Sequence, residues 1–247
     1  TLALAMPAPS GADAAPPASC GGYRLITSVQ GAGALAARTL AIYRARTLAR
    51  LEGRGEIETA CVDLTGDAQP ELIIQTYSGG AHCCFEIFVY RLHPSFQRLL
   101  RYEANNAGGF KVHRLGGRIV LELGDDSFAY YEDLCYACSP ARLPMAACYG
   151  GGRFADCTRQ YPQLVRPYAA HYTVMLKEAV RQTEDWRLQP MRGFALGLYA
   201  SYALLGNASE GVRVAAQIVP DEVIRWVTAQ RPAVQKWLAR RAGTLKR

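Results

Sequence analysis

The stretch ELIIQTYSGGAHCCFEIFVYRL, residues 71–92, decides the fold class of the first part of the chain. Residues 71–78 and 84–92 are rich in β-branched and aromatic side chains, which favour strands, and a glycine pair stands between them. Turn residues follow, and further segments of the same kind cover residues 23–29, 56–62, 96–103, 110–115 and 118–124. We therefore predict an antiparallel β-meander, folded into a sandwich or a propeller-like stack. Residues 39–51 fit a strand or a helix equally well.

The pattern becomes helical after Tyr161. Four or five helices are predicted, over residues 171–186, 191–207, 209–219, 221–230 and 232–241. Prolines stand where helices begin and Gly206 where one ends. An apolar stripe on the last two helices is typical of a core and consists of Val223, Trp226, Val227, Val234, Trp237 and Leu238. The sequence thus predicts an α+β protein with a disulfide-stapled β domain at 20–160 and a small basic helical domain at 161–247.

Residues 1–19, TLALAMPAPSGADAAPPAS, resemble the end of a signal peptide followed by a small-residue, Pro/Ala-rich leader. We therefore expect export to the periplasm, the cell surface or the medium. The segment before Cys20 lacks the apolar residue of a lipoprotein box, which speaks against lipidation there. No apolar run approaches the roughly 20 residues of a membrane span.

Eight cysteines, an even number, agree with an oxidising compartment. They are Cys20, Cys61, Cys83, Cys84, Cys135, Cys138, Cys148 and Cys157. Neighbouring strand residues point to opposite faces, so Cys83 and Cys84 are expected to pair with different partners, and Cys61 is the natural candidate for one of them. The CYAC motif at 135–138 leads into prolines and further cysteines, which favours a disulfide-rich loop over a thioredoxin-type centre or a zinc knuckle.

The loop DLTGDAQPEL, residues 63–72, places oxygen-bearing side chains at alternate positions, as a hard cation requires. The candidate ligands are Asp63, Thr65, Asp67, the Gln69 carbonyl and Glu71. The segment resembles the calcium loop of FG-GAP or VCBS-type repeats, D-x-N-x-D-G-x-x-D-L, and in particular exported bacterial proteins in which such a loop precedes SGGAHCC. Ala68 stands where those loops have glycine. The resemblance implies a structural Ca²⁺ ion; the alternative is a metal-free turn held by Asx hydrogen bonds.

Three histidines in or beside the meander, His82, His93 and His113, form a second candidate metal site, for copper or zinc. A copper site would indicate a redox role such as superoxide removal, although the H-x-H pair of copper–zinc superoxide dismutases is missing. The alternative is three separate, hydrogen-bonded histidines. The acid pairs 125–126 and 132–133 would suit a carbohydrate-active enzyme only if two carboxylates faced each other across a cleft.

Charge divides the chain unevenly. Residues 1–157 contain 14 Lys/Arg and 15 Asp/Glu, whereas residues 158–247 contain 14 and 6, with no acid after Glu222. In an exported protein this favours an anionic envelope polymer, or an envelope or surface-layer protein, over nucleic acid as the partner. We therefore expect a non-enzymatic accessory or binding module of the cell envelope, and the alternative is a copper-dependent redox protein.

Overall fold

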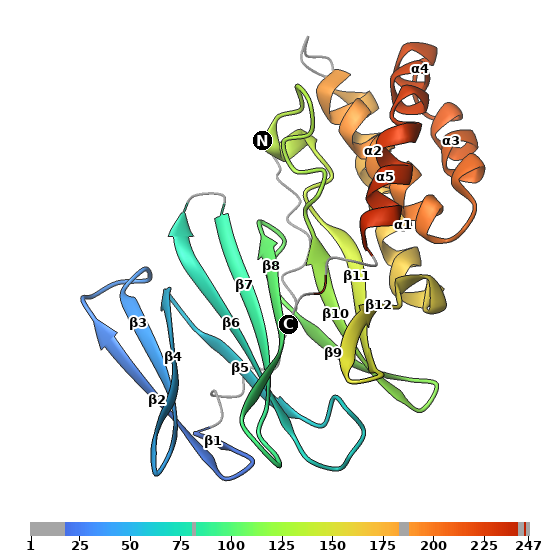
Figure 1. The fold of residues 1–247 in the computed structure, drawn as a ribbon. Coiled ribbons are helices and arrows are strands. Elements are labelled where there is room, and N and C mark those ends of the chain that lie inside the picture. Colours follow the sequence, from blue (N-terminus) through green and yellow to red (C-terminus); the bar gives the residue numbers. More distant parts are fainter. Residues whose placement is uncertain (1–17, 81–82, 183–187, 242–244, 246–247) are drawn as a thin grey trace. The chain divides into compact units, whose positions relative to one another are not determined.

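The computed structural model describes residues 18–80, 83–182, 188–241 and 245, with the side chain of Cys83 excluded (Figure 1). Within these residues the chain forms three four-stranded sheets followed by five α-helices. The α+β class and the order of strands before helices are therefore confirmed. The predicted leader lies almost wholly outside the described residues.

The first sheet has the order β1-β2-β3-β4. Its strands are β1 (Ser19–Cys20), β2 (Tyr23–Gln30), β3 (Ala37–Arg44) and β4 (Arg46–Arg54). The ambiguous segment 39–51 thus belongs to two antiparallel strands. Gly31 and Gly33, each with φ of 90°, form the turn of the β2–β3 hairpin, a backbone conformation that glycine adopts at no steric cost.

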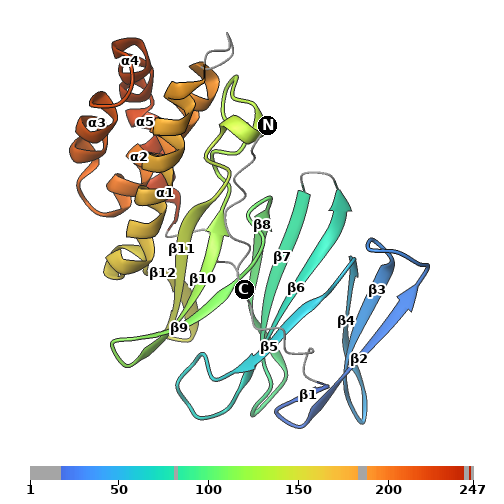
Figure 2. The same cartoon turned by 180° about the vertical axis from the view of Figure 1, so that it is seen from behind.

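The second sheet has the order β5-β6-β7-β8 and contains the stretch 71–92 (Figure 2). Its strands are β5 (Glu58–Val62), β6 (Glu71–Gly80), β7 (Cys83–Arg91) and β8 (Gln97–Asn105). In the antiparallel register of β6 and β7, Leu72 lies opposite Tyr90 and Ile74 opposite Phe88. These four side chains share one face of the sheet, as the period of two requires.

That face packs against the first sheet. Leu72, Ile74, Phe88 and Tyr90 belong to one buried cluster with residues of β2, β3 and β4, among them Leu40, Ile42 and Leu51. Two sheets that share one apolar layer fit both predicted arrangements, a sandwich and a propeller-like stack. A disulfide between Cys20 and Cys61 joins β1 of the first sheet to β5 of the second.

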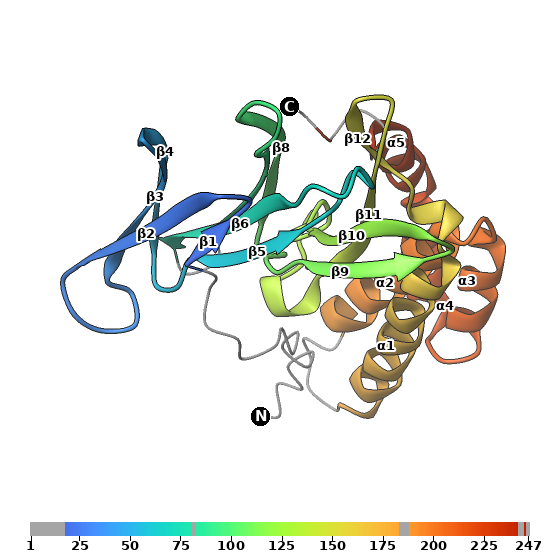
Figure 3. The ribbon, with the colours of Figure 1, turned by 90° about the horizontal axis from the view of Figure 1, so that it is seen from below.

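The third sheet has the order β12-β11-β10-β9. Its strands are β9 (Lys111–Leu115), β10 (Arg118–Asp125), β11 (Leu143–Gly150) and β12 (Arg153–Asp156). Figure 3 shows β9 and β10 as the hairpin predicted around Gly116 and Gly117. The sequence did not predict β11 and β12.

The helices are α1 (Pro162–Arg181), α2 (Leu188–Leu204), α3 (Ala208–Ala216), α4 (Asp221–Ala229) and α5 (Arg231–Arg241). They share one apolar core, which contains Val223, Val227, Val234 and Trp237 of the predicted stripe. Helix α1 begins nine residues before the prediction, and residues 183–186 of that prediction lie outside the described part of the chain. Among the described helices, none is long and apolar enough to cross a membrane.

Contacts between residues divide the chain into two compact units. The first, called the β unit, comprises the described residues up to Leu123 together with Tyr149–Phe154. The second, called the helical unit, comprises Gly124–Cys148 and Ala155–Leu245. The predicted boundary at residue 160 lies just before α1, whereas residues 124–148 already group with the helices.

Candidate functional site

The loop between β5 and β6 is closed by hydrogen bonds to its own carboxylates. The two oxygens of Asp63 accept from the amides of Gly66 and Ala68, at 2.7 and 2.9 Å. Glu71 is fully buried, and its Oε2 accepts from the amides of Leu64 and Thr65, at 2.9 and 3.1 Å. Burial raises the pKa of the Glu71 carboxyl, and the two amides partly oppose that shift.

Ala68 occupies the position at which the calcium loops have glycine, and its φ is 66°. An L-residue pays roughly 1–2 kcal/mol for this left-handed conformation. The backbone of the turn is therefore the kind that favours glycine, although the side chain is a methyl group.

These hydrogen bonds belong to the metal-free turn that the sequence offered as the alternative to calcium. Asp67 also accepts from an amide, that of Gln69, at 2.9 Å. Within the described residues, no group of three or more His, Cys, Asp or Glu side chains is arranged to hold a metal ion. In this arrangement the carboxylate oxygens of the loop accept hydrogen bonds from backbone amides. Calcium binding stays a prediction.

Two of the candidate copper ligands, His93 and His113, each contact a different hydrogen-bonding partner. His93 Nε2 lies 2.7 Å from the carbonyl oxygen of Gly21, and His113 Nε2 lies 2.6 Å from a carboxylate oxygen of Glu122. His82, the third candidate, lies outside the described residues. The structure therefore supplies no argument for copper or zinc at these positions.

Three disulfides lie wholly within the described side chains, and they pair Cys20 with Cys61, Cys135 with Cys138 and Cys148 with Cys157. The expectation that Cys61 pairs with Cys83 or Cys84 is wrong, because β1 brings Cys20 to β5 instead. The side chain of Cys83 is outside the described part.

The CYAC motif closes on itself rather than cross-linking distant strands. Its turn lies against α2: the Cys135 amide donates to Oε1 of Gln189, and Gly193, one helical turn further, faces the carbonyl of Cys138. A Cβ atom on Gly193 would lie 1.7 Å from that carbonyl oxygen, so only glycine permits this approach.

In each of the two acid pairs, one carboxylate is held by another side chain. Asp133 lies 3.7 Å from Arg192 in an ion pair, whereas Asp125 is buried and accepts from the indole N–H of Trp237 at 2.8 Å. Asp125 also lies 3.3 Å from Nη1 of Arg241. Its role is therefore to hold the last helix in place.

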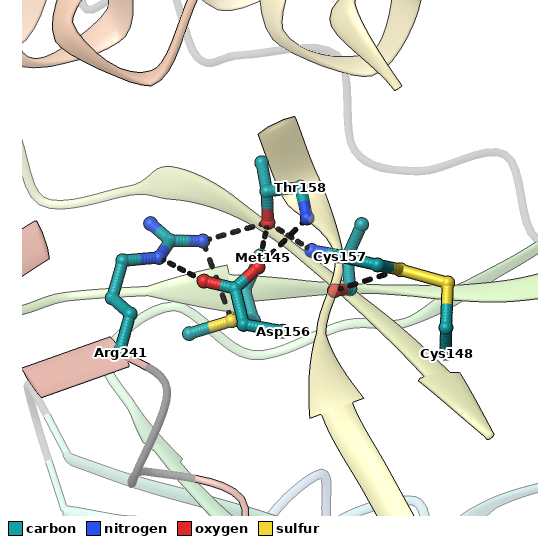
Figure 4. The surroundings of a disulfide bond; sticks show 7 residues. Met145, Cys148, Asp156, Cys157, Thr158 and Arg241 are labelled. Carbon is teal, nitrogen blue, oxygen red and sulfur yellow. Dashed lines mark hydrogen bonds and ion pairs between the residues drawn. A yellow bond between two sulfur atoms is a disulfide. The ribbon is translucent and has the colours of Figure 1, made fainter. Parts of the chain in front are cut away.

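Figure 4 shows the network around that arginine. Arg241 is only 3 % exposed, and its Nε donates to Asp156 at 2.6 Å. Its Nη2 donates to the carbonyl of Pro144 and to the hydroxyl of Thr158, at 2.7 and 2.9 Å. A buried guanidinium must be paired and hydrogen-bonded, and this one is. Cys157, next to Thr158 in the chain, carries the disulfide to Cys148.

A groove of about 580 Å³ opens within the helical unit, between α2, α3, α4, α5 and the short 3₁₀ turn Thr158–Gln160. Its base is apolar and is formed by Tyr199, Ala203, Val212, Val234 and Leu238. Its rim consists of exposed polar side chains: Asn207, Ser209, Thr228 and Gln235. This volume is in the range of small-molecule sites, and an apolar base with a few polar groups is their usual composition.

Two exposed arginines, Arg159 and Arg231, also line this groove together with Gly206 and Ala208, and the lining contains no acid. Arg159 reaches the turn between α2 and α3, because a Cβ atom on Gly206 would lie 3.7 Å from its Nη2. Glu210, an acid of α3, forms an ion pair with Arg213 at 2.6 Å. The sequence did not predict this groove. The one feature of the sequence that pointed to it was the scarcity of acids in the last part of the chain.

No protein-family model, no curated protein and no solved structure matches the chain.

Proposed function

We propose that this chain is an exported, non-enzymatic binding module of the cell envelope, whose helical unit binds an anionic envelope polymer. The observation that carries the proposal is a set of exposed cations without an ion pair among the described residues of the helical unit. These are Arg159, Arg166, Lys177, Arg225, Arg231 and Lys236. Exposed cations that outnumber the acids of the same unit create a positive field that attracts polyanions.

The β unit suits the role of a stable platform. Its shared apolar core and the Cys20–Cys61 disulfide stabilise it without any ligand. Three disulfides in the described residues also fit an oxidising, extracytoplasmic location. The copper-dependent alternative gains no support from the positions of His93 and His113.

The test compares two triple variants that remove the same charge from different units. The first is Lys177→Gln, Arg225→Gln and Lys236→Gln in the helical unit; the second is Arg24→Gln, Arg46→Gln and Arg50→Gln on the first sheet. All six side chains are exposed. Binding of the full chain to polygalacturonate, a linear polycarboxylate, is measured at two salt concentrations.

The helical triple is expected to bind about tenfold more weakly and with a shallower salt dependence, while the sheet triple stays near the wild-type affinity. An equal loss of affinity in both variants would show that only the net charge of the chain matters, and would contradict the proposal. Undetectable binding of the wild type at low salt would contradict it as well.

A further inference from the structure

We infer that the groove between α2, α3, α4 and α5 is a binding site for a small amphipathic anion, a molecule with one carboxylate or phosphate head and a short apolar body. The groove shares Arg159 and Arg231 with the set of cations proposed above to bind the polymer. Lys177, Arg225 and Lys236, which test polymer binding, do not line the groove. The two assignments are therefore tested by different substitutions.

The charge of the lining selects an anion. Arg159 and Arg231 lie at the groove, and neither forms an ion pair or hydrogen bond with any residue that the structure describes. Arginine stays protonated at all relevant pH values, and its planar donors bind carboxylate and phosphate in a two-point manner. Because no Asp or Glu lines the groove, no internal group satisfies these two cations.

The base of the groove selects an apolar body. Tyr199, Ala203 and Val234 are buried within the helical core, and Val212 and Leu238 pack against it as partly buried residues. A ligand seated on these side chains would remove from water the apolar surface that they still expose, chiefly on Val212 and Leu238. A purely polar anion would leave that surface wet, and a neutral hydrocarbon would leave the arginines unpaired.

Four exposed polar residues around the base can form hydrogen bonds with the part of the ligand that joins its anionic head to its apolar body. Asn207, Ser209, Thr228 and Gln235 carry hydroxyl and amide groups that donate and accept hydrogen bonds. At about 580 Å³, the groove admits a ligand of small-molecule size but is too small for a folded partner.

The experiment titrates the full chain by calorimetry with four probes: octanoate, octyl phosphate, octanol and acetate. Saturable binding is expected for octanoate or octyl phosphate, and whichever binds more tightly identifies the head group. Octanol and acetate, which lack the head or the body, are expected to bind at least about tenfold more weakly.

Two variants connect the binding to the groove. Arg159→Gln combined with Arg231→Gln is expected to weaken the tighter probe by about tenfold or more, because charge-assisted hydrogen bonds are lost. Lys236→Gln, which removes one exposed charge from the same helix α5 outside the lining, is expected to change it less than twofold. Both variants alter exposed side chains, and an unchanged thermal unfolding curve verifies their fold.

Absence of saturable binding by both anionic probes would overturn the inference. An equal effect of Lys236→Gln and the double variant would place the anion elsewhere, and octanol binding as tightly as octanoate would refute the role of the arginines. These outcomes are independent of polymer binding, because the helical triple variant retains both groove arginines.

Discussion

Arg241, the last residue of α5, donates from Nε to the carboxylate of Asp156, the last residue of β12, at 2.6 Å in the protein interior. The two residues lie 85 positions apart in sequence, so their contact fixes the final helix to the strand that precedes the first one. Trp237 stacks beneath the same guanidinium, 4.8 Å from ring centroid to Cζ. This buried network is the anchor of the helical unit.

Removing the cation of this network should destabilise the folded protein. Arg241→Met leaves the buried Asp125 and the partly buried Asp156 without their cation, and we expect the free energy of unfolding in urea to fall by about 3 to 5 kcal/mol. Adding Asp156→Asn in the double variant should cost less than the sum of the two single changes, because the groups are coupled. Lys236→Met, exposed on the same helix, is the control and should change stability little.

Gly193 should not tolerate a methyl group. In the interior of a helix, Gly→Ala normally stabilises by about 1 kcal/mol. At this position the sign should reverse, because the new Cβ atom meets the carbonyl oxygen of Cys138 and forces α2 away from the CYAC turn. Gly150→Ala, whose Cβ atom meets nothing within 4 Å, is the control for thermal unfolding. A Gly193→Ala variant more stable than the wild type would refute the close approach.

Ala68→Gly should stabilise the protein. The substitution removes the left-handed strain of the β5–β6 loop, roughly 1–2 kcal/mol, and the greater freedom of glycine in the unfolded chain offsets about half of it. Ala41→Gly in β3, where φ is negative, should destabilise instead. Urea unfolding of both variants measures the difference, and a loss of stability in Ala68→Gly would contradict the assigned turn.

The hydrogen bonds of the same loop lead us to expect no effect of calcium on stability. Asp63 and Glu71 already accept from four loop amides, which hold the turn closed. Thermal unfolding is therefore expected to have the same midpoint in excess calcium and in EDTA. A rise with calcium that Asp67→Asn abolishes would instead establish the cation site that the FG-GAP or VCBS resemblance implies.

Local patterns predicted those elements whose residues alternate or repeat along one segment. The pairing of 71–78 with 84–92 followed from β-branched runs around a glycine turn, and Gly206 and Pro220 marked helix boundaries correctly. Strand β11 was missed because six consecutive residues of LPMAACYG are buried, so no polar alternation distinguishes its faces. Helix α1 begins earlier than predicted, and it accommodates Pro162 and Pro167 because both lie in its first two turns.

Sites that depend on tertiary contacts could not be predicted in this way. Asp125 belonged to an acid pair in the sequence, and Arg241 to a basic tail, yet the fold buries them together. The cation-bearing groove combines Arg159 with Arg231, which no motif connects. The predicted partner of Cys61 was wrong for the same reason. Its actual partner, Cys20, lies on β1, which is too short to be recognised as a strand from the sequence.

Hydrogen–deuterium exchange on the full chain, with and without polygalacturonate, tests most directly the claim that the helical unit is the anion-binding part. We predict slower amide exchange in α1, α4 and α5 when the polymer is bound, with unchanged exchange in β2, β3 and β4 of the arginine-bearing first sheet. Protection confined to the first sheet, or no protection under conditions of saturated binding, would contradict the account.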